Sequence, residues 1–464
     1  MSAGLDVRST SRADRRWMGT ARMLLRTRRA RRRKDAGAVL RALARGREGA
    51  VGLNLRGRHV LLVLDPGLAS ELLSGLAAST IKGPGLQLTR PMLGEGLLTS
   101  EGAAHQRARR LVAPAFAPRR LEGYVEIFGR CTRDFAATWR DGQQRNVHAD
   151  MGALTLQTAG ETLLGVDLAA QAARVRTGLD AALSAFGAAS GMGAGAFGSG
   201  RASAPGVPGS DGGAGVRAVH ELVDNIIEER RSTASADRGY VISALLAASD
   251  EPGGLTAGEV HDHVMTLLLA GHETTASTLA WTLYLLGRHP FALQRVQSEA
   301  DALGDRPVSA ADLPGLRYTR AVVSEATRLY PPAWIIGRSV TTDLTLDGWQ
   351  LPAGSIAAVS PLLLHHDPRW YPDPEQFDPE RWLGDHSPVP RHAFLPFGTG
   401  PRACIGEQFA WTEAIAVLAT LARTWTFQVD PGFRPALSYQ VTLRPSGGIP
   451  MTVRAREVSR RGGL

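Results

Sequence analysis

The chain has 464 residues, of which 44% are hydrophobic and 21% charged, a composition typical of a folded globular protein that excludes a largely disordered one. Apolar runs such as 60–64 are far shorter than the roughly 18 residues that span a bilayer, so we expect no transmembrane anchor. The two cysteines, Cys131 and Cys404, are too few and too far apart for a disulfide framework, which predicts a reducing, cytoplasmic location.

The net charge of +9 is concentrated at the N-terminus. Residues 1–47 hold 15 of the 53 basic residues and three Asp, a net of +12, so the other 417 residues carry a net of −3. The basic run from Arg26 to Lys34 could bind nucleic acid or an anionic membrane surface. Because such runs are more often solvated tails, we interpret residues 1–34 as a flexible arm and expect no nucleic-acid partner.

The first elements after this arm indicate a small mixed β region. Apolar residues at helical spacing predict a helix over 35–47. Residues 50–64 read as a β-hairpin that turns at Gly57, and Asp65–Pro66 then has the form of a helix N-terminus.

From about residue 105 to residue 335 the apolar spacing is mainly helical. Gly, Ala, Ser and Pro dominate residues 187–215, which could not bury enough apolar surface to hold a fixed helix. We therefore predict one large domain over 35–464, mainly α with a minor β region, and a flexible lid loop over 187–215.

Polar residues interrupt the apolar helix predicted over about 260–286. Gly271 leaves space beside the helix, and the Thr274 hydroxyl can bond a preceding carbonyl and loosen the helix ladder. An acid next to an alcohol, Glu273–Thr274, suits proton transfer. The plain alternative is a buried polar kink.

Further along, Glu325 and Arg328 share one helix face, although in most proteins the two charges of such a pair are simply exposed to solvent.

The segment 397–406, FGTGPRACIG, carries the decisive cysteine. Gly398 and Gly400 allow a tight loop that a flat ligand could approach closely. A helical run begins at Glu407, so Cys404 lies near a helix N-terminus, where the helix dipole and loop N–H groups favour a thiolate. An isolated cysteine would more simply be a small buried residue, which is our interpretation of Cys131.

This segment resembles the haem-binding signature of the cytochrome P450 family. The matching positions are Phe397, Gly398, Gly400, Arg402, Cys404 and Gly406. The resemblance extends over roughly 35–455 and implies the cytochrome P450 fold, haem b as the cofactor and Cys404 as the axial ligand of its iron. It implies a monooxygenase that inserts one oxygen atom from dioxygen, by hydroxylation or epoxidation.

The same resemblance assigns roles to the other motifs. In oxygen activation Thr274 would supply a hydrogen bond and Glu273 would relay protons from solvent. A buried scaffold for the cysteine loop would consist of Glu325, Arg328 and Arg381. The haem propionates need cationic or hydrogen-bonding partners. The resemblance places His105, Arg109, Arg338 and Arg402 there, with Phe397, Gly398, Gly406, Ala270 and Gly271 as further haem contacts. For His105 an exposed helix position is the alternative.

The expected substrate pocket is apolar and offers no charge placed to hold a carboxylate or amine. Its candidate residues are Leu86, Leu88, Met92, Leu269, Ala333, Trp334, Ile335 and Val441, and about half of such a set would be core packing instead. We predict a neutral, lipophilic substrate of secondary metabolism, first a terpenoid, then a polyketide or fatty acyl chain.

The electron supply is expected to be separate. No second cysteine cluster could hold an iron–sulfur centre, so electrons from NAD(P)H would arrive through a ferredoxin and its reductase. Two other functions stay open: a peroxide-using haem-thiolate peroxygenase and a non-catalytic haem-binding sensor. The Glu273–Thr274 pair speaks against the first, and no output domain accompanies the second.

Overall fold

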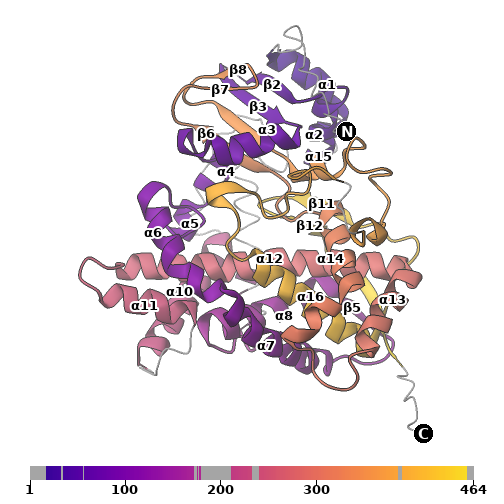
Figure 1. Cartoon of the computed structure of the whole chain (residues 1–464). Helices are drawn as coiled ribbons and strands as arrows, with labels where there is room; N and C mark the ends of the chain where they lie inside the picture. The colour runs from indigo at the N-terminus through magenta and orange to yellow at the C-terminus, as the bar shows by residue number, and fades with distance from the viewer. Residues whose placement is uncertain are drawn as a thin grey trace, which may run out of the picture.

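The computed structural model describes residues 17–32, 35–55, 57–171, 175, 177–178, 211–232, 240–384 and 389–456. As the sequence predicts, the architecture is mainly helical with a smaller β part. Figure 1 shows the main sheet at one end of the molecule and the long helices beneath it.

The helices are α1 (Thr20–Arg32), α2 (Ala36–Ala44), α3 (Pro66–Ser70), α4 (Pro84–Gln87), α5 (Arg90–Leu93), α6 (Gly102–Val112), α7 (Pro118–Ala136), α8 (Val147–Ala159), α10 (Asp211–Ser232), α11 (Val241–Asp250), α12 (Ala257–Arg288), α13 (Pro290–Asp301), α14 (Arg317–Leu329), α15 (Pro361–His365) and α16 (Glu407–Thr424). Two π-helical turns are η2 (Glu71–Gly75) and η5 (Gly160–Leu164). The 3₁₀ turns include η3 (Ala77–Ser79), η4 (Ala113–Phe116), η6 (Ala310–Gly315), η7 (Pro379–Trp382) and η8 (Gly400–Arg402).

The strands are β1 (Met18–Gly19), β2 (Ala50–Leu55), β3 (Arg58–Val63), β4 (Thr80–Lys82), β5 (Gln143–Asn146), β6 (Ile336–Val340), β7 (Leu344–Leu346), β8 (Trp349–Leu351), β9 (Ile356–Val359), β10 (Trp425–Gln428), β11 (Ala436–Tyr439), β12 (Leu443–Ser446) and β13 (Pro450–Ala455).

The main sheet has the order β1-β2-β3-β9-β6-β4. The predicted hairpin is present as the antiparallel pair β2–β3, and Gly57 at its turn has φ of 86°, which glycine adopts without steric strain. At the other edge β4 pairs with β6 so that Lys82 lies opposite Arg338. The sheet therefore brings two cations from distant parts of the chain to one place.

Helix α12 is the central element of the helical part. It covers and slightly exceeds the helix predicted over 260–286, and buried residues occur on every side of it, as expected for a helix inside the core. At its start Thr256 accepts a hydrogen bond from the Glu259 N–H, and the Glu259 side chain accepts one from Thr256 N. This capping box satisfies N–H groups that have no partner within the helix.

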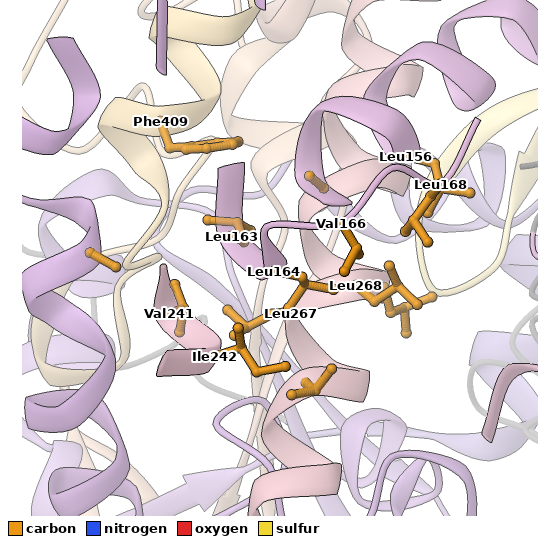
Figure 2. Packing of buried hydrophobic residues seen from close by; sticks show 14 of the residues in the cluster. Leu156, Leu163, Leu164, Val166, Leu168, Val241, Ile242, Leu267, Leu268 and Phe409 are labelled. Carbon is orange, nitrogen blue, oxygen red and sulfur yellow. The ribbon is translucent and has the colours of Figure 1, made fainter. Parts of the chain in front are cut away.

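The core beside α12 is a dense aliphatic cluster. Leu267 and Leu268 of α12 belong to one buried cluster with Leu163 and Leu164 of η5 and with Val241 of α11 (Figure 2). Two further helices, α8 and α16, pack against α12. Tight packing of this kind fixes the rotation of α12 about its own axis, and so determines which of its residues face the functional site.

The N-terminal arm has ordered elements that the sequence analysis does not predict. Within residues 17–32, β1 pairs with β2, and α1 packs on α2 through buried Met23. The Arg26 Nε donates to the Ala42 carbonyl at 2.7 Å. Of the predicted arm, residues 1–16, 33 and 34 lie outside the described residues. Of the predicted lid loop, 187–210 lies outside them too, and α10 begins at Asp211.

Within the described ranges, no helix is both long enough and apolar enough to cross a membrane.

The capping box gives a stability prediction. Replacing Thr256 by Ala leaves the Glu259 N–H without its side-chain acceptor, so the free energy of unfolding should fall by about 0.5–2 kcal/mol. Urea unfolding followed by circular dichroism measures the change, with Thr256→Ser as the control that keeps the hydroxyl. An unchanged midpoint in Thr256→Ala would show that the cap contributes nothing.

Candidate active site

The loop that carries Cys404 is held in shape by glycine and by one backbone hydrogen bond. Gly398 and Gly400 have φ of 67° and 77°, a region that other residues rarely adopt. A side chain at Gly400 would come within 2.5 Å of the Leu73 carbonyl oxygen, so only glycine fits against η2. Cys404 N–H donates to the Phe397 carbonyl at 2.9 Å and closes the loop. The sequence spacing of the two glycines therefore reflects a real steric requirement.

The Cys404 sulfur has an exposed surface, and that surface faces the interior cavity rather than the outside of the protein. Burial raises the pKa of the Cys404 thiol, and a hydrogen bond from the Gly406 backbone lowers it by a smaller amount. The expectation that the helix terminus and loop N–H groups make the thiolate favourable is thus met only in part. A bound metal cation would supply the missing stabilisation, since coordination deprotonates a thiol.

A cavity of about 1000 Å³ extends from the Cys404 loop to α12. Met92, predicted to line the pocket, is instead buried in the core beside Leu93, because the short helix α5 turns it inward. The predicted site residues that do line the cavity are Leu86, Leu88, Leu269, Ala270, Gly271, Glu273, Thr274, Ala333, Trp334, Ile335, Arg338, Phe397, Gly398, Arg402, Cys404, Gly406 and Val441.

The helix ladder of α12 is modified where it borders this cavity. The Thr274 hydroxyl donates to the Ala270 carbonyl at 3.0 Å, the bond that the sequence predicts. From α8, the Thr155 hydroxyl donates to the His272 carbonyl at 3.0 Å. A Cβ at Gly271 would lie 3.5 Å from Leu163, an ordinary contact distance, so the packing of α12 does not itself require glycine at this position, which borders the cavity.

Glu273, the expected proton carrier, is tied to the late hairpin of β11 and β12. Thr442 donates its hydroxyl hydrogen to Glu273 Oε1 at 2.8 Å, and Arg444 Nη1 lies 3.7 Å from the same oxygen. The carboxylate is buried. Sequence reasoning missed both partners, which lie about 170 positions away and belong to no recognised motif.

A cluster of cations lies along β4 and β6 at the edge of the cavity. Arg338 is buried, its Nε has no hydrogen-bond partner within the described part of the chain, and burial lowers its pKa to about 10. Burial also lowers the pKa of Lys82 to about 8, although Nζ donates to the carbonyls of Leu97 and Ser100. Lys82 is one of two lysines in the chain, and sequence analysis gave it no role.

The predicted residues of α6 and the cysteine loop join this cluster. His105 is buried, which does not fit the exposed alternative, and burial followed by the charge of Lys82 lowers its pKa to about 4. Arg402 forms an ion pair with Glu101 at 2.9 Å. Arg109 donates to the Ala403 carbonyl at 2.7 Å, so its guanidinium is directed to the cysteine loop.

These features fit haem. Among the described residues a single carboxylate, Glu101, stands with several cations, and the Arg338 Nε, unpartnered there, can donate to an added acid group. Haem carries two such carboxylates. Arg338, Arg402 and Lys82 would hold them, and Cys404 would bind the iron in the cavity that α12 also lines. Bound there, haem would supply the redox-active iron needed for oxygen activation.

Behind the cysteine loop lies a fully buried ion pair. Glu325 and Arg328 of α14 are both 0% exposed and bond in a bidentate way, with two contacts of 2.8 Å. Arg381 Nε donates to Glu325 at 3.1 Å, so the three residues expected to form the scaffold are in contact. Trp382 Nε1 adds a bond to Glu325 at 2.9 Å that the sequence analysis did not predict.

The scaffold reaches the cysteine loop through a histidine. Arg328 Nη1 donates to the carbonyl of His365 at 2.7 Å. The Nε2 atom of that histidine accepts the N–H of Leu395 at 2.9 Å, two residues before Phe397. A continuous set of hydrogen bonds thus runs from α14 to the start of the loop.

Glu413 of α16 is a further buried acid that the sequence analysis missed. It is fully buried, Thr158 of α8 donates to it, and the hydroxyl of Thr275 on α12 lies against it. Burial raises its pKa to about 8. The available sequence signal was an acid among apolar residues, about two turns into the helix that follows Cys404.

Comparison with known proteins gives the family. A family model described as Cytochrome P450 matches residues 25–451. Cyclooctatin synthase of Streptomyces melanosporofaciens is 38% identical over 406 residues, which cover 86% of this chain and 88% of that protein. The cyclooctat-9-en-7-ol 5-monooxygenase of the same species is 39% identical over 363 residues, 76% of each chain. Pentalenene oxygenase of Streptomyces avermitilis is 37% identical over 346 residues, 74% of this chain and 76% of its own.

Fold, cysteine loop and these matches agree, and the chain belongs to the cytochrome P450 family. It is accordingly a monooxygenase with haem as its cofactor.

The buried acid gives a pH prediction. The pKa of Glu413 is about 8 in the folded protein against 4.5 as its ordinary value, so between these pH values only the unfolded chain releases the proton. Stability is therefore lost as pH rises through this range. We expect the difference in unfolding free energy between the natural protein and Glu413→Gln to fall from pH 5 to pH 8, as measured by urea unfolding at each pH. A difference independent of pH would contradict a protonated Glu413.

Proposed function

We propose that this monooxygenase oxidises a neutral, lipophilic terpenoid in secondary metabolism. The observation that carries the proposal is the apolar lining of the cavity around Thr274, formed by residues such as Leu269, Ala333, Ile335 and Val441. Apolar walls orient a ligand by shape and leave a carboxylate or amine unpaired, which disfavours charged substrates.

The charged residues of the cavity support this reading by their positions. Lys82, Arg338 and Arg402 belong to the cation cluster proposed to hold haem, and Glu273 is occupied by Thr442 and Arg444. Two relatives are named for the oxygenation of cyclooctat-9-en-7-ol and of pentalenene, both terpenoid compounds. The likeness of these chains makes a terpenoid the first choice over a polyketide or a fatty acyl chain.

Glu273 and Thr274 are proposed to deliver protons. The Thr274 hydroxyl borders the cavity, where it can orient a proton donor, and Glu273 next to it can exchange protons once Thr442 releases it. Val441 lines the cavity and precedes Thr442 in the chain. A substrate that contacts Val441 would therefore affect the hydrogen bond between Thr442 and Glu273. An acid–alcohol pair has no use in an enzyme that takes ready-made peroxide, which favours dioxygen as the oxidant.

Electrons are proposed to come from NAD(P)H through a ferredoxin and its reductase. Arg109 contacts the cysteine loop, and its neighbour Arg110 in the last turn of α6 is exposed. A basic surface next to Cys404 suits an acidic ferredoxin.

The substrate class is tested by optical titration of the purified ferric protein with terpenes, fatty acids and polyketide-like lactones. We expect a saturable shift of the haem spectrum towards high spin with terpenes and a weaker or absent shift with the other two classes. A shift confined to fatty acids or lactones would overturn the terpenoid assignment while leaving the family unaffected.

The proton relay is tested by Thr274→Ala. Loss of the hydroxyl should reduce the product formed per NAD(P)H consumed by about tenfold or more, because positioned acid–base groups contribute about 10²–10⁴-fold. Thr278→Ala is the matched control, since Thr278 also lines the cavity one turn further along α12. Equal coupling in the two variants would remove Thr274 from the relay.

A further inference from the structure

The outer face of α1 combines arginine with exposed leucine. The helix, TARMLLRTRRARR, contains six arginines and no acidic residue. Leu25 is 74% exposed and Leu24 39% exposed. In the part of the chain that the structure describes, the other exposed large apolar residues are Leu88 and Phe291. Two of these four exposed apolar side chains, Leu24 and Leu25, are therefore adjacent on one strongly basic helix.

The inner face of α1 is fixed to the protein, which determines what the outer face presents. Met23 and Thr27, four residues apart, are buried, and Arg26 donates to carbonyls at the end of α2. Leu25 and Arg29 each lie two positions after one of these buried residues, on the opposite, exposed face of the helix. Helix α1 is thus anchored on one side and offers apolar and cationic side chains on the other, beside the sheet (Figure 1).

The cavity extends to this helix. Leu24 on α1 and Leu88 just after α4 both line the cavity and are both exposed, which fits an opening of the cavity between these two elements. The same cavity contains Cys404 and Thr274 at its other end. A molecule that enters at α1 therefore has a continuous path to the reactive part of the site.

We propose that α1 is an interfacial helix that binds an anionic phospholipid bilayer and sets the mouth of the cavity against it. An amphipathic helix with Arg on its polar face and Leu beside it lies in the plane of a bilayer, with leucine among the acyl chains and arginine on the phosphates. A lipophilic substrate concentrates in the same layer and enters without crossing water. The nature of the substrate rests on the proposed function, whereas the membrane contact rests on α1 alone.

A bilayer fits this surface better than nucleic acid does. Nucleic acid would pair with the arginines through its phosphates, but exposed leucines gain nothing beside a hydrated phosphate backbone. The bilayer interface satisfies both kinds of side chain. The two partners therefore differ in one measurable way, the dependence of binding on Leu25.

The test is co-sedimentation of the full-length haem-loaded protein with vesicles of phosphatidylcholine, alone or mixed with phosphatidylglycerol. We expect binding to the anionic vesicles to exceed binding to the neutral ones by about tenfold, with losses of similar size in Leu25→Ser and in Arg28→Gln/Arg29→Gln. Phe291→Ser, which removes an 83% exposed apolar side chain, and Arg133→Gln/Arg140→Gln, which removes two exposed arginines, are matched controls that should bind like the natural protein.

Two outcomes would overturn the proposal. One is equal binding of the Leu25→Ser variant and the natural protein, above all if duplex DNA competes with vesicles in a salt-dependent way, which would assign the surface to nucleic acid. The other is an equal loss in the matched controls: in Arg133→Gln/Arg140→Gln it would make the effect one of overall charge, and in Phe291→Ser one of overall exposed apolar surface. Because the measurement needs no substrate, failure here leaves the optical titration unaffected, and a failed titration leaves the vesicle result standing.

Discussion

The position of the active site depends on the buried ion pair between Glu325 and Arg328. Two charges with no exposure to water are tolerated only when every oxygen and N–H around them is bonded. That condition gathers α14, η7 and the chain after α15 around the ion pair, with Arg381 and Trp382 as further donors to Glu325 and the Pro374 carbonyl as an acceptor from Arg328. Through His365 the same set of bonds reaches the segment before Phe397. The position of the loop that carries Cys404 therefore depends on an ion pair that lies outside the loop.

Two kinds of polar environment border the apolar cavity, and they are built differently. At the β4–β6 edge cations outnumber the one nearby carboxylate, which suits an anionic cofactor. At the α12 side the acid Glu273 has its own hydroxyl and guanidinium partners on the β11–β12 hairpin. The first arrangement is incomplete until a ligand arrives, whereas the second is satisfied and has to be opened. The groups proposed to bind haem and the groups proposed to deliver protons are thus separated in space, and only the second set is already paired within the protein.

What could be predicted from the sequence is what local spacing encodes. The hairpin at 50–64, the central helix and the tight loop before Cys404 follow from alternation, helical period and glycine placement. Glu325 and Arg328 were found because they are three residues apart. Lys82, Arg444 and Glu413 were not, because their partners lie on other elements and no periodicity shows the pairing. For Met92 and α1 only the composition could be read from the sequence, because tertiary packing decides which side chains are buried.

The pairing of β4 with β6 sets Lys82 directly opposite Arg338. Like charges on facing positions of adjacent strands repel, and here both are also removed from water. The charge of Arg338 disfavours the protonated form of Lys82, and carboxylates bound beside the two cations would offset this repulsion. By linkage, a ligand that binds the folded form alone shifts the folding equilibrium towards it. Bound haem would therefore contribute to the stability of the fold as well as to the chemistry of the site.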